Sequence, residues 1–184
     1  VGVTTSTAAQ SPGTTRAAQL RELEAYITKG MTDWEIPGLS IAVVRNDTIM
    51  YTRGFGVRQL GAPGAVDDQT LFGIMSTTKA FTALGMAMLV DDGKLKWDDP
   101  VTKWVPEFQF PDVFTTREAT VKDLLTHNLG LGNADLLWAR LDLPRAEIFR
   151  RVRFLTPAYS LRGGFTYQNV MYGLAGEVIA RASG

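Results

Sequence analysis

Clear β-strand signals in this chain are confined to two adjacent segments between Leu39 and Gly56, and this limits the fold more than any other feature. The segments read LSIAVVR and TIMYTRGFG, are rich in β-branched and aromatic residues, and are separated by Asn46-Asp47. That pattern predicts a β-hairpin. Two strands cannot complete a sheet or shield a hydrophobic core. We therefore predict an α+β fold in which an antiparallel sheet, incomplete within this chain, is flanked by helices and accompanied by an all-helical subdomain.

Helical signals precede the hairpin. Apolar residues spaced by three and four positions predict an amphipathic helix that begins near Thr15 and ends before Pro37 and Gly38. Its expected apolar stripe consists of Leu20, Leu23, Ile27, Met31 and Trp34.

Helical signals also follow the hairpin. An apolar helix is expected from about Ser76, and a short one after an N-cap at Thr120. Pro144 is expected in the first turn of a further helix, and the last helix begins near Asn169.

These signals divide the chain into three segments. We expect residues 1–15 to form a flexible leader, residues 16–75 the first part of an α/β domain, and residues 76–184 a largely helical region. The remaining strands are expected to come from a missing C-terminal segment or from a second chain. Expressed without that partner, the 184 residues are expected to be insoluble or molten and inactive.

Composition excludes several classes of function. The chain has 19 basic and 19 acidic residues, so its charge does not favour binding to nucleic acid. It has no cysteine and a single histidine, His127, which excludes disulfides, thiol catalysis and a multi-histidine metal site within the chain. No apolar run reaches the ~20 residues of a membrane span. The small residues STAA in the leader resemble the end of a signal peptide. We therefore expect a periplasmic or secreted protein, with a cytoplasmic one as the alternative.

Ser76 and Lys79 form a Ser-x-x-Lys pair at the start of the apolar helix. At this spacing the two side chains share one helix face, about 5–6 Å apart at Cβ, near the free N–H groups of the helix N-terminus. Such groups suit acyl transfer, because a neutral lysine can accept the hydroxyl proton while amide donors stabilise an oxyanion. The alternative is a serine cap followed by a solvated lysine, which the spacing alone favours. The apolar sequence after Lys79 favours the catalytic interpretation, because it partly desolvates the ammonium.

A second pair, Tyr167 and Asn169, lies in a turn just before the last helix. At positions i and i+2, both side chains can point to the same side of the chain. A phenol near an ammonium can ionise and carry a proton, and a carboxamide can bind a lysine and a substrate carbonyl together. The alternative is a core tyrosine followed by an asparagine helix cap.

Four segments in a fixed order carry a resemblance to a known family. They are FGIMSTTKAFTA, DGKLKWDDPVTKWVPEF, LLTHNLGL and FTYQNVMYGLAGEVI. Together they resemble the serine β-lactamase and penicillin-binding-protein superfamily, and within it class C β-lactamases with their esterase and D-aminopeptidase relatives. Ser-x-x-Lys is a known motif of such enzymes. The resemblance extends from about Leu39 to Gly184 and implies the N-terminal portion of a β-lactamase/transpeptidase-like fold.

The resemblance implies a role for each candidate residue. Ser76 would be the acylated nucleophile, Lys79 its partner in proton transfer, and Tyr167 an activator of the serine and later of the hydrolytic water. Asn169 would contact Lys79 and the substrate. The backbone N–H of Ser76 would supply half of an oxyanion hole. His127 would be structural, as a lone histidine at a helix end usually is.

The implied activity is that of a serine hydrolase that forms an acyl-enzyme on esters, amides or β-lactams, without metal or cofactor. Its expected partners are a small-molecule or peptide substrate and the polypeptide that completes the fold, with no nucleic acid. The alternative is a non-catalytic or slowly deacylating penicillin-binding sensor or scaffold.

Three departures from the family pattern stand out. Leu129 occupies the place of a serine that usually follows the histidine segment, and Met75 that of a glycine or alanine before the nucleophile. The family's third motif, a lysine or histidine two residues before a glycine, does not occur after Tyr167.

Overall fold

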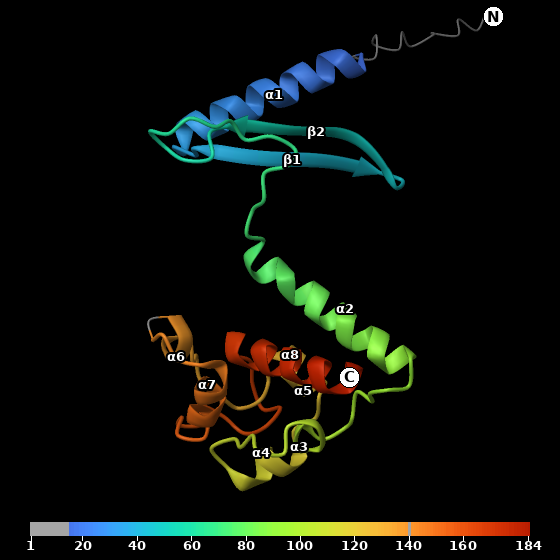
Figure 1. Cartoon of the computed structure of the whole chain (residues 1–184), viewed down its shortest axis with the longest axis vertical. Coiled ribbons are helices and arrows are strands. Elements are labelled where there is room, and N and C mark those ends of the chain that lie inside the picture. Colours follow the sequence, from blue (N-terminus) through green and yellow to red (C-terminus); the bar gives the residue numbers. More distant parts are fainter. Residues whose placement is uncertain (1–14, 140) are drawn as a thin grey trace, which may run out of the picture. The chain divides into compact units, whose positions relative to one another are not determined.

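The computed structural model describes residues 15–139 and 141–184, and it divides the chain into two compact units with the boundary after Gly73 (Figure 1). Unit 1 contains a helix and a β-hairpin, and unit 2 is built from helices. The α+β class with a small antiparallel sheet, predicted from the sequence, is confirmed. Apart from Thr15, the expected leader lies outside the described residues.

Unit 1 consists of α1 (Arg16–Asp33), β1 (Gly38–Arg45) and β2 (Thr48–Gly56). The strands pair antiparallel, with Gly38 opposite Gly56 and Arg45 opposite Thr48. Asn46 and Asp47 connect them with φ values of 48° and 57°. Two consecutive positive φ values are typical of a type I′ turn, whose twist matches that of the strands. The predicted hairpin is therefore confirmed.

Helix α1 packs along the hairpin (Figure 1). Ile27 is its buried residue, and the Glu24 carboxylate accepts a hydrogen bond from Tyr51 at 3.0 Å and pairs with Arg53. The prediction for Trp34 is wrong. This residue is 80% exposed and follows the last helical residue, so its side chain leaves the apolar stripe.

Unit 2 begins with a 3₁₀ turn that leads into a long helix. Its elements are η1 (Met75–Thr77), α2 (Thr78–Asp91), α3 (Val101–Trp104), α4 (Val113–Glu118), α5 (Asp123–Thr126), α6 (Leu136–Ala139), α7 (Arg145–Val152) and α8 (Asn169–Ser183).

Helix α8 is the centre of this unit. It contacts α2, α3, α5 and α7. Its buried side chains, among them Met171, Leu174 and Val178, pack with Met86 and Leu89 of α2 in one hydrophobic cluster. Burial of such side chains supplies most of the stabilisation of a domain. These contacts hold α8 against α2, the first long helix of unit 2.

Two predictions about helix starts need correction. Thr120 does not cap the helix that follows it: its N–H and hydroxyl both donate to the Asp123 carboxylate, at 2.9 and 2.7 Å, and α5 begins only at Asp123. The acidic side chain folds back on the threonine and replaces the expected cap. Pro144 is the N-cap of α7 rather than a member of its first turn.

The apolar sequence of α2 is buried on one side only. Phe81, Leu84 and Met88 are exposed, at 63%, 56% and 60% of their surface. Among the described helices, none combines the length and the hydrophobicity that a membrane span requires. Export stays a prediction, because the residues that indicated it lie outside the described part.

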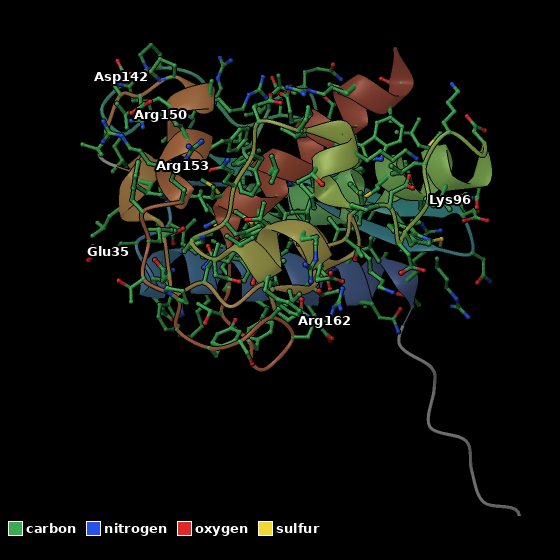
Figure 2. The ribbon with its side chains drawn as sticks, turned by 90° about the horizontal axis from the view of Figure 1, so that it is seen from below. Glu35, Lys96, Asp142, Arg150, Arg153 and Arg162 are labelled. Carbon is green, nitrogen blue, oxygen red and sulfur yellow. The ribbon has the colours of Figure 1, made fainter. Side chains whose placement is uncertain are left out.

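An ion pair between the half-exposed Arg162 and the buried carboxylate of Asp123 fixes the loop that leads into α8. Asp123 is nearly inaccessible, and Arg162 donates two hydrogen bonds to its carboxylate, at 3.0 and 2.6 Å. Figure 2 shows Arg162 on this loop, below the helices of unit 2. Burial raises the pKa of Asp123, but the bonds from Arg162 and Thr120 outweigh it and hold the pKa below its usual value. The carboxylate is thus charged at neutral pH and anchors the segment that carries Tyr167.

Candidate active site

The turn around Ser76 presents its hydroxyl to solvent. Ser76 lies in η1 immediately before α2, and its side chain makes no capping bond. Met75 precedes it with φ of 46°, a conformation that is uncommon for residues other than glycine. A helical turn leaves its first N–H groups without partners, so this is also a place where backbone donors can receive an oxyanion.

Four predicted site residues come together at this turn. Lys79 Nζ donates to Ser76 Oγ at 3.2 Å and to Asn169 Oδ1 at 2.6 Å. Tyr167 OH donates to Ser76 Oγ at 2.5 Å. The ammonium also lies 4.5 Å from the centre of the Tyr167 ring. The serine oxygen is therefore in contact with both an ammonium and a phenol, which belong to residues near the start and near the end of the unit 2 sequence.

The charge on Lys79 changes the acidity of its neighbour. The hydrogen bond from Lys79 is the largest contribution that lowers the pKa of Tyr167, and the bond to Ser76 adds to it. Partial burial of the phenol opposes this effect but does not cancel it. A phenol with a lowered pKa gives up and regains a proton more easily near neutral pH.

A carboxylate that the sequence analysis missed supports the amide of Asn169. Asp135 Oδ1 accepts from Asn169 Nδ2 at 2.9 Å and from Trp138 Nε1 at 3.0 Å, and Oδ2 accepts from Asn133 at 3.2 Å. Burial raises the pKa of Asp135, but these hydrogen bonds and the charge of Lys79 outweigh it and lower the pKa. The ionised carboxylate can only accept, so it holds the NH₂ end of the amide and turns the oxygen toward Lys79.

Side chains alternate in direction along Tyr167, Gln168 and Asn169. Gln168 has extended backbone angles, φ −130° and ψ 118°, so neighbouring side chains point to opposite sides. Its buried side chain donates to the carbonyls of Leu131 and Gly132. The alternation brings Tyr167 and Asn169 to the site and anchors the residue between them in the interior.

His127 supports the same segment from the other side. Its Nδ1 accepts a hydrogen bond from the backbone N–H of Gln168 at 3.0 Å, so this nitrogen carries no proton. Burial, and secondly the charge of Lys79, lower the pKa of His127. The ring also packs against Tyr167 and Tyr172, with centroids 4.7 and 5.3 Å apart. These contacts agree with the structural role expected for it.

The two substituted positions differ in their surroundings. Leu129, in the place of the usual serine, is buried in the hydrophobic cluster of unit 2. Met75 is 83% exposed, next to Ser76. Neither side chain donates or accepts hydrogen bonds at the site.

Comparison with known proteins identifies the family of the chain. The Beta-lactamase family profile matches residues 23–184. The unguisins hydrolase ungD of Aspergillus violaceofuscus is 31% identical over 89% of this chain and 30% of its own length. Esterase EstB of Burkholderia gladioli is 30% identical over 91% of this chain and 46% of its own length. The octameric penicillin-binding protein homologue from Pyrococcus abyssi aligns with a TM-score of 0.78 at 31% identity, over 89% of this chain and 39% of that chain.

These matches cover less than half of each relative but nearly all of this chain. The profile match includes both the Ser-x-x-Lys segment and the Tyr-x-Asn segment. The order of helix, hairpin and helical region agrees with it, as does the resemblance of the four sequence segments. This chain belongs to the Beta-lactamase family.

Proposed function

We propose that the protein is a serine hydrolase in which Ser76 forms an acyl-enzyme with esters, amides or β-lactams. The observation that carries this proposal is the convergence of Lys79 and Tyr167 on Ser76 Oγ, at 3.2 and 2.5 Å. A capped helix with a solvated lysine would need neither contact. The names of two relatives, a hydrolase and an esterase, support the same class of reaction.

The proposed reaction has two halves. In the first, Tyr167, which has lost its proton to solvent and is a phenolate beside the Lys79 ammonium, accepts the hydroxyl proton as Ser76 Oγ forms a bond to the substrate carbonyl carbon. The tetrahedral intermediate then collapses: the bond to the leaving group breaks, and the leaving group takes up that proton. In the second, the Tyr167 phenolate accepts a proton from water as the water oxygen attacks the acyl carbon. The bond from the acyl carbon to Ser76 Oγ then breaks, Tyr167 returns the proton to Oγ, and the acid is released. The Ser76 N–H donates to the oxyanion in both halves.

The relatives also bear on what the complete site contains. Because this chain covers 30% to 46% of them, we propose that polypeptide beyond the 184 residues supplies the third motif, the second oxyanion donor and the remaining strands. Assays of activity therefore belong on the complete protein.

Covalent labelling tests the proposal. The complete protein is treated with a fluorophosphonate and, separately, with a penicillin, and the modified peptide is identified by mass spectrometry. We expect an adduct on Ser76, and turnover of at least one substrate among short-chain nitrophenyl esters, nitrocefin and D-amino-acid peptides. An adduct that persists without turnover would indicate the sensor instead. A chain that does not react at Ser76 would be a scaffold.

We further propose that Asp135 is a positioning residue that acts through Asn169. If its carboxylate is replaced in Asp135→Asn, the Asn169 amide can turn its NH₂ group toward the Lys79 ammonium. Because hydrogen bonds to charged groups contribute about 1.5–3 kcal/mol, we expect kcat to fall by about tenfold to a hundredfold with KM little changed.

Asn133→Ala is the matched control for this variant. It removes another donor from the same carboxylate, together with the acceptor of the Asp135 backbone N–H, but does not remove either partner of the bond to Asn169. Rates and thermal melting are measured for both variants. If Asp135→Asn lowers the melting temperature while the folded enzyme keeps its normal kcat, the residue is structural and the proposed role is wrong.

A further inference from the structure

A cavity of about 550 Å³ lies between α7, the C-terminal half of α8 and the segment that follows α3. Its volume falls within the ~300–1,000 Å³ typical of sites for small molecules. Its lining residues on α8 are Glu177 and Arg181, which lie roughly 12 and 18 Å along the helix from Asn169. None of the four residues that meet at Ser76 is in the lining. We call this second cavity the α7–α8 cavity.

The buried part of the α7–α8 cavity is apolar. Val105 and Phe108 line it and are 2% and 3% exposed. The Phe149 ring meets that of Phe108 edge-on, with centroids 6.4 Å apart, and Ala146 adds a methyl group from the same helix as Phe149. Such a surface binds a hydrocarbon group by the hydrophobic effect.

The charged side chains at the cavity are arginines and glutamates, and each glutamate is already bound to an arginine. Arg181 donates to Glu177 at 2.9 Å and to Glu107 at 3.2 Å. Arg150 donates two hydrogen bonds to Glu147, at 2.6 and 2.8 Å. The charges of Arg181 and Arg150 are therefore balanced by neighbouring carboxylates.

Arg145 and Arg153 also line the cavity, and their charges are not balanced in this way. Within residues 15–139 and 141–184, neither guanidinium group forms an ion pair with a carboxylate. Arg153 Nε donates to the Arg150 carbonyl at 3.1 Å, which leaves its other N–H groups available. Figure 2 shows Arg150 and Arg153 at α7, with Asp142 in the loop before this helix; Asp142 does not line the cavity. Two guanidinium groups with unbalanced charge thus border an apolar space.

We infer that the α7–α8 cavity binds a small amphipathic carboxylate, with its hydrocarbon body on the apolar surface and its carboxylate group on Arg145 and Arg153. The planar guanidinium fork matches the two oxygens of a carboxylate. A neutral apolar molecule would not use the two positive charges, and a small inorganic anion would not use the apolar surface. The inference does not depend on the proposed function, because none of its residues belongs to the Ser76 site.

Calorimetric titration of the complete protein with octanoate tests the inference. We expect octanoate to bind, and octanamide, which has the same chain without the charge, to bind about tenfold to a hundredfold more weakly. Each methylene removed between octanoate and butanoate should weaken binding by about fourfold. Higher ionic strength should weaken the binding of octanoate, because it screens the attraction between the carboxylate and the guanidinium groups.

Arg145→Gln and Arg153→Gln are each expected to weaken the binding of octanoate by about tenfold. Arg145 is exposed, so its replacement should leave the fold intact. Arg117→Gln is the matched control: it removes the same charge from an exposed arginine of α4 that does not line the cavity. This variant should bind octanoate as tightly as the unmodified protein.

A second pair of variants introduces a negative charge. Ala146 is an exposed lining residue of α7, and Ala146→Glu should weaken the binding of octanoate by about tenfold or more, because it places a carboxylate beside the two arginines. Ala180→Glu adds the same group at an exposed position of α8 outside the lining and should leave binding unchanged. Thermal melting identifies any variant that does not fold.

Lys79→Met separates this cavity from the candidate active site, whose cation it removes. Octanoate should bind to this variant with unchanged affinity. Loss of binding in Lys79→Met but not in Arg145→Gln would place the carboxylate at Ser76 and overturn the inference. Octanamide that binds as tightly as octanoate would also overturn it, as would the absence of any binding, which is the result expected if further polypeptide fills the cavity in the complete protein.

Discussion

Ser76→Ala is expected to lower kcat/KM by on the order of 10⁴-fold or more, because removal of a nucleophile leaves only binding and oxyanion stabilisation. The substitution removes one exposed hydroxyl and fills no space. Folding should therefore be unaffected. Steady-state hydrolysis of the best ester, with thermal melting of the same sample, measures the effect.

Thr77→Ala is the matched control for this loss. Thr77 carries a neighbouring hydroxyl in the same 3₁₀ turn, and its side chain makes no capping bond. The Thr77→Ala variant should keep both the hydrolysis rate and the covalent labelling of the unmodified enzyme. If Ser76→Ala retained more than a small fraction of the activity, or were still labelled, the nucleophile would have to be another residue.

Lys79→Met and Tyr167→Phe are expected to slow acylation by about 10²- to 10⁴-fold each, the usual contribution of a positioned acid or base. Both substitutions keep most of the side-chain volume. Lys79→Met removes the ammonium that bonds to Ser76 and Asn169, and Tyr167→Phe removes the phenol 2.5 Å from Ser76 Oγ. The burst of nitrophenol in rapid mixing gives the acylation rate directly, apart from substrate binding.

Tyr172→Phe distinguishes the role of the phenol from that of an aromatic ring. The Tyr172 ring also lies near the Lys79 ammonium, at 5.2 Å, but its hydroxyl donates to the Leu125 carbonyl, away from Ser76. The acylation rate of the Tyr172→Phe variant should therefore equal that of the unmodified enzyme. Equal losses in Tyr172→Phe and Tyr167→Phe would mean that ring packing, rather than proton transfer, accounts for the effect.

Local patterns in the sequence were sufficient for the hairpin, for the longer helices α1, α2 and α8 and for pairs of site residues, but not for the short helices α3, α4 and α6. The hairpin follows from two β-rich segments around Asn46-Asp47, whose backbone angles the structure confirms. Helical spacing places Ser76 and Lys79 on one face, and extended spacing does the same for Tyr167 and Asn169. That these two pairs meet, 91 residues apart at Ser76 and Tyr167, was expected only from the family resemblance.

Contacts between distant segments could not be read from the sequence. Asp135 follows a short loop in which nothing marks a link to Asn169, 34 residues away. Thr120 looked like a cap because the pattern does not reveal which side chain folds back on which. Trp34 continued the spacing of the helix, but the chain had already left it. In each case a tertiary contact or a backbone turn outweighs the local preference.

The extended backbone of Gln168, between Tyr167 and the first residue of α8, restricts how the length of this segment can change. Insertion or deletion of one residue would reverse the alternation and turn a core side chain toward Ser76. Insertion of two would restore the direction but move Asn169 by roughly 6.6 Å, which is beyond hydrogen-bonding reach of Lys79. The segment therefore tolerates substitutions but not insertions or deletions. Any residue at position 168 must still have a side chain that fits into the interior of unit 2.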